Sequence, residues 1–147
     1  GGIGGIEDYD FSKYTSAWDG SMGVKAWSKI YYSEYTDNST QTYGLVRVSG
    51  GWDITDYTLS VSNKDVLVGQ SGFGYYGSNP IPGGITQTES ITTFGYSFSQ
   101  DIDPNWLHVI KELDHIFGVN TECTVSRGGS SWQLNLQNNV VLGLITP

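Results

Sequence analysis

The sequence predicts an all-β, mainly antiparallel fold: a β-sandwich with one short packed α-helix over residues 104–117. Composition is the first observation, because only 15% of the 147 residues are charged, while Gly, Ser, Thr, Asn, Gln and Tyr are abundant. That mixture favours strands over helices. The second observation is a repeated alternation of apolar and polar residues, the pattern of half-buried strands. One domain over residues 9–147 is expected at this length.

The segments VKAWSKIYY at 24–32 and TYGLVRV at 42–48 predict a hairpin or two neighbouring strands, since both are rich in aromatic and β-branched residues. The polar segment SEYTDNSTQ between them predicts the turn, and Asn38 in it begins a glycosylation sequon. A second hairpin is predicted from alternation over residues 57–61, a turn at Asn63-Lys64 and a strand over 65–69.

Residues 69–84, GQSGFGYYGSNPIPGG, contain six glycines and two prolines, and they predict a long surface loop. Residues 85–100, ITQTESITTFGYSFSQ, alternate again and predict a strand. The last third predicts strands over 121–127, 131–137 and 140–146. A tight turn is expected at Asn138-Asn139, because adjacent asparagines tolerate positive φ.

The predicted helix over residues 104–117 is the one segment with a helix start signal and a helix stop signal. Asp103 can cap its first amides, Pro104 suits the first helical position, and Gly118 can close its end. At helical spacing, one apolar stripe would pack on the sheet, and it consists of Trp106, Val109, Ile110, Leu113 and Phe117.

The opposite stripe of this helix places His108, Glu112 and His115 together and is a weak candidate for a metal site. A zinc site needs three or four ligands with supporting partners, and no fourth ligand is evident. A solvated helix face is the favoured interpretation, with a pH-sensitive contact as an alternative. No cofactor is expected.

Catalytic groupings have little support in the sequence, so we expect a protein that is not an enzyme. Asp53 with Asp56 and Asp101 with Asp103 are paired carboxylates of the kind that glycosidases use. Their spacing in the sequence does not establish the distance across a cleft that this chemistry requires. The lone Cys123 lies in the strand-like TECTVS and is expected to be a buried, unreactive side chain.

Charge and composition narrow the expected partners and compartment. The formal net charge of −8 argues against nucleic acid. No apolar run is long enough for a transmembrane segment. The polar β-rich composition predicts a secreted, extracellular protein. The opening GGIGGIED, from Gly1 to Asp8, carries no signal-like segment and predicts the start of a mature chain, a Gly-rich arm that is flexible or ordered by a partner.

Aromatic residues exceed what one modest core needs, with five Trp and ten Tyr. Aromatic rings and amides on loops are typical of sugar-binding surfaces. We therefore predict a non-enzymatic recognition domain for a glycan or cell-surface component. Its candidate ligand-binding residues are Trp18, Trp52, Phe73, Tyr75, Tyr76 and Asn79.

Two other functions stay open. One is a self-assembling extracellular filament or coat subunit, in which residues 1–8 of one copy add a strand to the sheet of another. The other is a membrane-active toxin or bacteriocin-like protein, since residues 85–99 are alternating and nearly uncharged, as a pore-lining strand would be.

Overall fold

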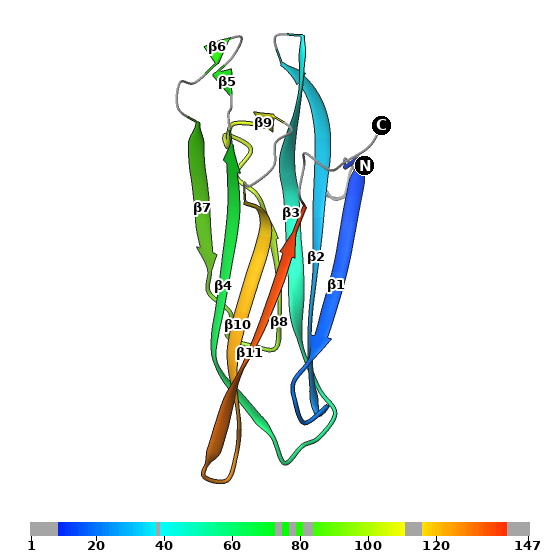
Figure 1. Ribbon diagram of the computed structural model, residues 1–147, viewed down its shortest axis with the longest axis vertical. Helices are drawn as coiled ribbons and strands as arrows, with labels where there is room; N and C mark the ends of the chain where they lie inside the picture. Colours follow the sequence, from blue (N-terminus) through cyan, green and yellow to red (C-terminus); the bar gives the residue numbers. More distant parts are fainter. Residues whose placement is uncertain are drawn as a thin grey trace.

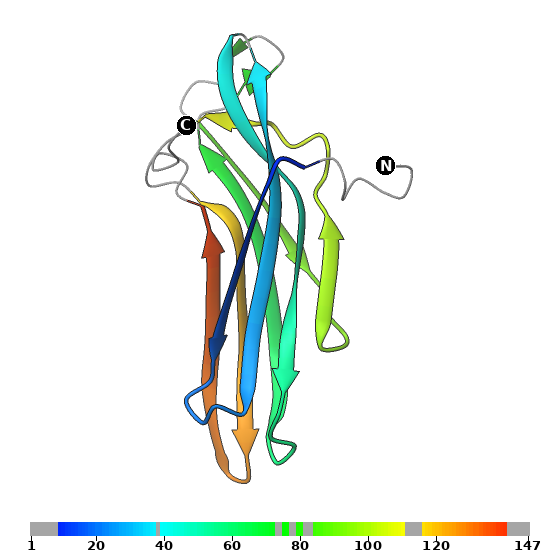
Figure 2. The same cartoon turned by 90° about the vertical axis from the view of Figure 1, so that its right-hand side faces the viewer.

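Two antiparallel sheets pack face to face in the computed structural model of the protein (Figure 1). The structure describes residues 9–37, 39–72, 75–76, 79–80, 84–110 and 116–140. The strands run roughly along the long axis of the molecule, as both views show (Figures 1 and 2). The predicted β-sandwich is therefore confirmed.

The first sheet has the order β1-β2-β3-β8, with the short β9 also paired to β3. Its strands are β1 (Phe11–Trp18), β2 (Val24–Asp37), β3 (Thr40–Ile54), β8 (Ser97–Asp101) and β9 (Val109–Ile110). The predicted pairing of residues 24–32 with 42–48 is confirmed as the β2–β3 hairpin. β2 continues past its apolar segment to Asp37, and β3 runs from Thr40 to Ile54.

The second sheet has the order β11-β10-β4-β7. Its strands are β4 (Ser60–Gly72), β7 (Ile85–Ile91), β10 (Phe117–Arg127) and β11 (Ser130–Asn139), and a separate two-stranded sheet joins β5 (Tyr75–Tyr76) to β6 (Asn79–Pro80). The predicted strands over 121–127 and 131–137 are confirmed as the β10–β11 hairpin, which turns at Gly128 with φ of 61°.

The core lies between the two sheets because alternate residues of each strand point inward. On β2 the side chains of Val24, Ala26 and Ile30 are fully buried, and β10 contributes Val119, Cys123 and Val125. Cys123 is thus the buried strand residue that the sequence predicted.

The predicted helix over residues 104–117 is wrong: residues 104–110 are not helical, Val109–Ile110 is β9, and Phe117 begins β10. The cap signal is real but local, since the Asn105 amide donates to Asp103 Oδ1 at 2.8 Å and the turn stops there. Tertiary contacts then hold the backbone of Leu107. Its amide donates to Gln87 Oε1 at 2.6 Å, and its carbonyl accepts from Gln70 Nε2 at 2.8 Å.

The turn predicted at Asn63-Lys64 is instead a β-bulge inside β4. Asp65 pairs with Glu122 and Ser62 with Thr124, so two residues of β4 lie opposite Cys123 alone. Asn63 has φ of 51°, the left-handed conformation that also suits a turn. The local preference was right, but the strand continues because β10 pairs with it on both sides of the bulge.

The single strand predicted over residues 85–100 is divided between the two sheets. β7 pairs with β4 in the second sheet and β8 pairs with β3 in the first, with residues 92–96 as the connection. Similarly, the loop predicted from residue 69 begins later, because β4 continues to Gly72. These boundaries depend on pairing partners, which alternation alone does not identify.

The tight turn predicted at Asn138-Asn139 is also wrong, because both residues belong to β11. Asn138 is fully buried, and its Nδ2 donates to the carbonyls of Ser28 at 3.1 Å and Lys13 at 3.0 Å. A buried amide therefore joins β11 to β1 and β2 across the sandwich. The strand predicted over 140–146 and the arm over residues 1–8 lie mostly or wholly outside the described residues.

Candidate functional site

Four aromatic side chains of the first sheet form a row on its outer surface, the aromatic face. They are Tyr14 and Trp18 of β1 with Trp27 and Tyr31 of β2. The inward positions of β2 are occupied by Ala26, Ser28 and Ile30, all fully buried, so alternation turns the intervening Trp27 and Tyr31 outward. The sheet itself therefore sets the positions of these rings.

Ring geometry on the aromatic face is defined by cross-strand neighbours. Tyr14 and Trp27 stack with centroids 6.2 Å apart and planes 20° apart, while Tyr9 meets the edge of Tyr31 at 4.8 Å. Tyr14 is 53% exposed and Trp18 is 41% exposed. Beside Trp27, the neighbouring β3 residue is Gly51, where a Cβ would lie 3.1 Å from Trp27 Nε1. The absence of a side chain there leaves room for the indole.

Cations lie among these rings. Lys25 Nζ is 5.8 Å from the centroid of the Trp18 ring, and Lys29 Nζ is 5.0 Å from that of Tyr31. Arg47 lies opposite Tyr31 on β3, and its Nε donates to Asp101 Oδ1 at 2.6 Å. The Asp101 hydrogen bond raises the pKa of Arg47. The face thus combines π surfaces with donors that can bind hydroxyl or carboxylate oxygens.

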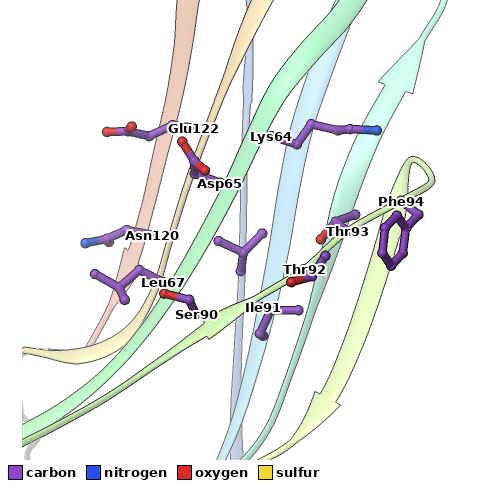
Figure 3. A pocket seen from close by; sticks show the side chains of 11 residues that line it. Lys64, Asp65, Leu67, Ser90, Ile91, Thr92, Thr93, Phe94, Asn120 and Glu122 are labelled. Carbon is purple, nitrogen blue, oxygen red and sulfur yellow. The ribbon is translucent and has the colours of Figure 1, made fainter.

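A separate feature is a groove of about 600 Å³ on the second sheet (Figure 3). It lies where the β7–β8 connection leaves the end of β7, and Lys64 of β4 contacts this connection, its Nζ donating to the Gly95 carbonyl at 2.6 Å. Figure 3 shows Lys64 and Phe94 on the side of this connection and Asp65 with Glu122 on the other side of β4. The groove is lined by residues of both charges together with Ser, Thr and Asn. Among these lining residues, no base is paired with a nucleophile.

Of the six predicted ligand-binding residues, the structure describes the side chains of two, Trp18 and Trp52, and these face opposite sides of the first sheet. Trp18 lies on the aromatic face. The prediction for Trp52 is wrong, because this residue is only 2% exposed and packs in the core near Phe98, where its ring cannot contact a ligand. Phe73 lies outside the described residues. The structure describes the backbones of Tyr75, Tyr76 and Asn79, which belong to β5 and β6, but not their side chains.

The weak metal candidate is not assembled by the described residues. His108 stacks on Tyr35 with ring centroids 3.7 Å apart and planes 9° apart, in the space above Gly44. Glu112 and His115 lie outside the described residues. Within the described part of the chain, no group of three or more His, Cys, Asp or Glu residues is arranged to hold a metal ion.

The carboxylate pairs considered from the sequence have structural contacts of their own. Asp56 accepts hydrogen bonds from Thr58 and Arg127, and the Thr58 hydrogen bonds lower its pKa. Asp101 pairs with Arg47, and Asp103 holds the local turn before Trp106. Burial raises the pKa of Cys123 to about 11, so its thiol is a poor nucleophile in the folded protein.

Tyr14, Trp27 and Tyr31 are not among the residues that the sequence predicted for the site, although a signal was present. In VKAWSKIYY, Trp27 and Tyr31 fall on the face opposite Ala26 and Ile30, which are small or aliphatic. Recognising the surface also required the register of β1 with β2, in which Tyr14 lies opposite Lys29 and Trp18 opposite Lys25. Local periodicity indicates which residues of one strand share a face, but it does not indicate which residues of another strand lie opposite them.

No family model, curated protein or solved structure matches this chain. Among the described residues, no helix is long and apolar enough to cross a membrane.

Proposed function

We propose that the protein is a secreted, non-enzymatic recognition domain that binds a glycan on the aromatic face. The observation that carries the proposal is the stacked pair Tyr14 and Trp27 on an outward sheet surface, with Trp18 and Tyr31 on the same surface. The flat faces of sugar rings pack well on exposed π surfaces, and their hydroxyls need nearby polar groups. Polar composition supports an extracellular location.

Polar groups suited to sugar hydroxyls surround the rings. By register, the outward positions next to the aromatic residues include Ser12 and Ser16 of β1 and Ser49 of β3. Hydroxyls both donate and accept hydrogen bonds, as sugar hydroxyls do. The arrangement therefore supports recognition rather than only apolar contact.

The shape of the surface favours a chain over a single sugar. Tyr14 and Trp18 are four residues apart on one strand, which is about 13 Å at the rise of a β-strand. Trp27 and Tyr31 have the same spacing on the adjacent strand. A row of rings without an enclosing pocket matches an extended polysaccharide that contacts several rings at once.

Binding to a panel of immobilised polysaccharides, measured with the intact protein by biolayer interferometry, tests the proposal. Trp18→Ala and Tyr14→Ala are expected to weaken binding about tenfold each, because each removes one ring platform. Tyr57→Ala is the control, since Tyr57 is 90% exposed but belongs to the β3–β4 connection and not to β1 or β2. The proposal fails if no polysaccharide binds, or if all three variants bind like the wild type.

The two alternatives depend on other segments. Self-assembly by strand donation depends on residues 1–8, which lie outside the described residues. A membrane-active function depends on one strand over residues 85–99, which the structure divides between β7 and β8. Neither gains a specific observation of its own.

A further inference from the structure

We infer that the polysaccharide bound by the aromatic face is anionic, and this inference rests on the proposed function. The face carries Lys25, Lys29 and Arg47, three of the seven Lys and Arg residues in a chain whose net charge is −8. Its carboxylates are Asp53, opposite Lys25, and Asp101, bonded to Arg47. Cations are therefore concentrated on this surface in an otherwise acidic protein.

Lys29 is the residue expected to contact the acid group. It lies on β2 between Trp27 and Tyr31, and its cross-strand neighbours are Tyr14 and Ser49. Among the described residues, no carboxylate forms an ion pair with it, in contrast to Arg47. An uncompensated ammonium group beside stacked rings is suited to a ligand that offers both a sugar face and a negative charge.

The position of the ammonium group supports the same conclusion. Lys29 Nζ lies 5.0 Å from the Tyr31 ring centroid, a contact that holds the flexible side chain near the ring surface. A carboxylate or sulfate on a sugar packed against Tyr14 and Trp27 would lie within reach of this group. Because the charge is already positioned, less side-chain entropy is lost on binding.

Charge on the opposite surface favours this face over the second sheet. Asp65 and Glu122 lie opposite each other on the outside of the second sheet, and the groove there holds one cation, Lys64. Lys64 already donates to Gly95 and lies 4.6 Å from the Tyr96 ring centroid. An anionic polymer is therefore repelled from that side and directed to the aromatic face.

Aromatic rings with cations also suit single-stranded nucleic acid, so the balance of charge decides between the two polymers. Nucleic acid carries a phosphate on every nucleotide, and its binding normally depends on several Lys and Arg contacts. Here the face has three cations and two carboxylates. This supports a polymer with sparser charge and more ring surface, as a polysaccharide has when only some of its sugars are acidic.

Two matched pairs of polymers test the inference with the intact protein. Sparsely de-esterified homogalacturonan is compared with the fully methyl-esterified polymer, which keeps the sugar backbone and has no charge, and dextran sulfate of low substitution is compared with dextran. The charged member of at least one pair is expected to bind about tenfold tighter. That preference should weaken strongly between about 50 mM and about 500 mM salt, because exposed charges are screened. Which pair shows it distinguishes carboxylate from sulfate.

The Lys29→Met variant identifies the residue. It is expected to remove the preference for the charged polymer, because affinity for that polymer should fall more than affinity for the neutral one. Lys64→Met, on the other sheet, is the control and should bind like the wild type. Trp18→Ala should weaken binding to both members of the pair.

Other outcomes separate the two proposals. Equal binding within both pairs, lost in Trp18→Ala, overturns the anionic inference and leaves glycan recognition standing. A charge preference unaffected by Lys29→Met also overturns the inference. No binding to any polysaccharide overturns both proposals, as does tighter binding to an oligothymidylate than to every polysaccharide. Concentration-dependent self-association blocked by Lys29→Met would assign the face to a second copy of the chain.

Discussion

The Asp19 carboxylate and the Trp132 indole join the two sheets, because Trp132 Nε1 donates a hydrogen bond to Asp19 Oδ2 at 2.9 Å. Asp19 follows β1 of the first sheet, whereas Trp132 belongs to β11 of the second. Asp19 is 2% exposed and also accepts from Ser21 and from the amides of Gly23 and Val24. One buried carboxylate thus organises the β1–β2 turn and attaches it to the opposite sheet.

Stability is expected to fall in acid through Asp19. Burial alone raises the pKa of this carboxyl, but hydrogen bonds from Ser21, Val24 and Trp132 outweigh burial and hold the pKa well below its usual range. A depressed folded pKa means that the carboxylate contributes fully at neutral pH and loses its contribution as the pH falls below about 4. Urea unfolding at a series of pH values measures this.

The Asp19→Asn variant isolates that contribution. It should cost about 2 kcal/mol at pH 7, where the charged acceptor is lost, and its stability should depend less on pH below about 4. Asp53→Asn, at an exposed position on β3, should stay close to the wild type. An acid-induced loss of stability that is equal in the wild type and in Asp19→Asn would contradict this role.

Asn138→Ala is expected to destabilise the sandwich by about 2 to 4 kcal/mol. It removes the donor shared by the Ser28 and Lys13 carbonyls and leaves a cavity at a fully buried position. Chemical denaturation gives the free energy of unfolding. Asn135→Ala, exposed on the same strand, should change it by less than about 0.5 kcal/mol. Similar losses in the two variants would show that the inter-sheet amide contributes nothing specific.

Gly118 is expected to tolerate no side chain. A Cβ there would collide with the backbone carbonyl of Asn138 on the paired strand β11, and neither backbone can yield without breaking the pairing. Gly118→Ala should therefore cost about 3 kcal/mol or prevent folding. Gly129→Ala, in the β10–β11 turn with no atom nearby, is the control. Thermal melting compares them, and an unchanged melting temperature for Gly118→Ala would disprove the collision.

Cys123 is expected to be unreactive in the folded protein. Burial, reinforced by the negative charge of Asp19, raises its thiol pKa to about 11, and the side chain is fully buried on β10. At about pH 8 the thiolate population is therefore very small. Ellman's reagent should label the native protein only as fast as it opens, and should label the denatured protein at once. Rapid stoichiometric labelling of native protein would contradict the prediction.

Local turn and cap signals correctly predicted backbone conformation, but they did not mark the ends of strands and helices. Asn63 adopts positive φ, as a turn residue would, yet it forms a bulge because β10 continues to pair with β4 beyond it. Asp103 makes the predicted side-chain hydrogen bond, yet no helix follows because Gln70 and Gln87 bind the Leu107 backbone. Residues that are distant in sequence decided both outcomes.

Burial was predicted better than secondary structure in the same region. Trp106, Val109 and Phe117 were expected to pack on a sheet from a helix, and they do lie in or against the core, but from a turn and two strands. Their apolar character required burial under any backbone geometry. Their helical spacing was compatible with burial but did not require a helix.

The sequence by itself determined the all-β class, the strands within residues 24–48 and 121–137, and the burial of Cys123, because composition and alternation are local properties. Tertiary structure decided where strands end, which tryptophan is core and which is surface, and how Tyr14 comes to stack on Trp27. The physical reason is that register and sheet packing depend on partners far along the chain. The same alternating pattern buries Trp52, which pairs with the inward Ala26, and exposes Trp18, which pairs with the outward Lys25, and only the cross-strand register distinguishes them.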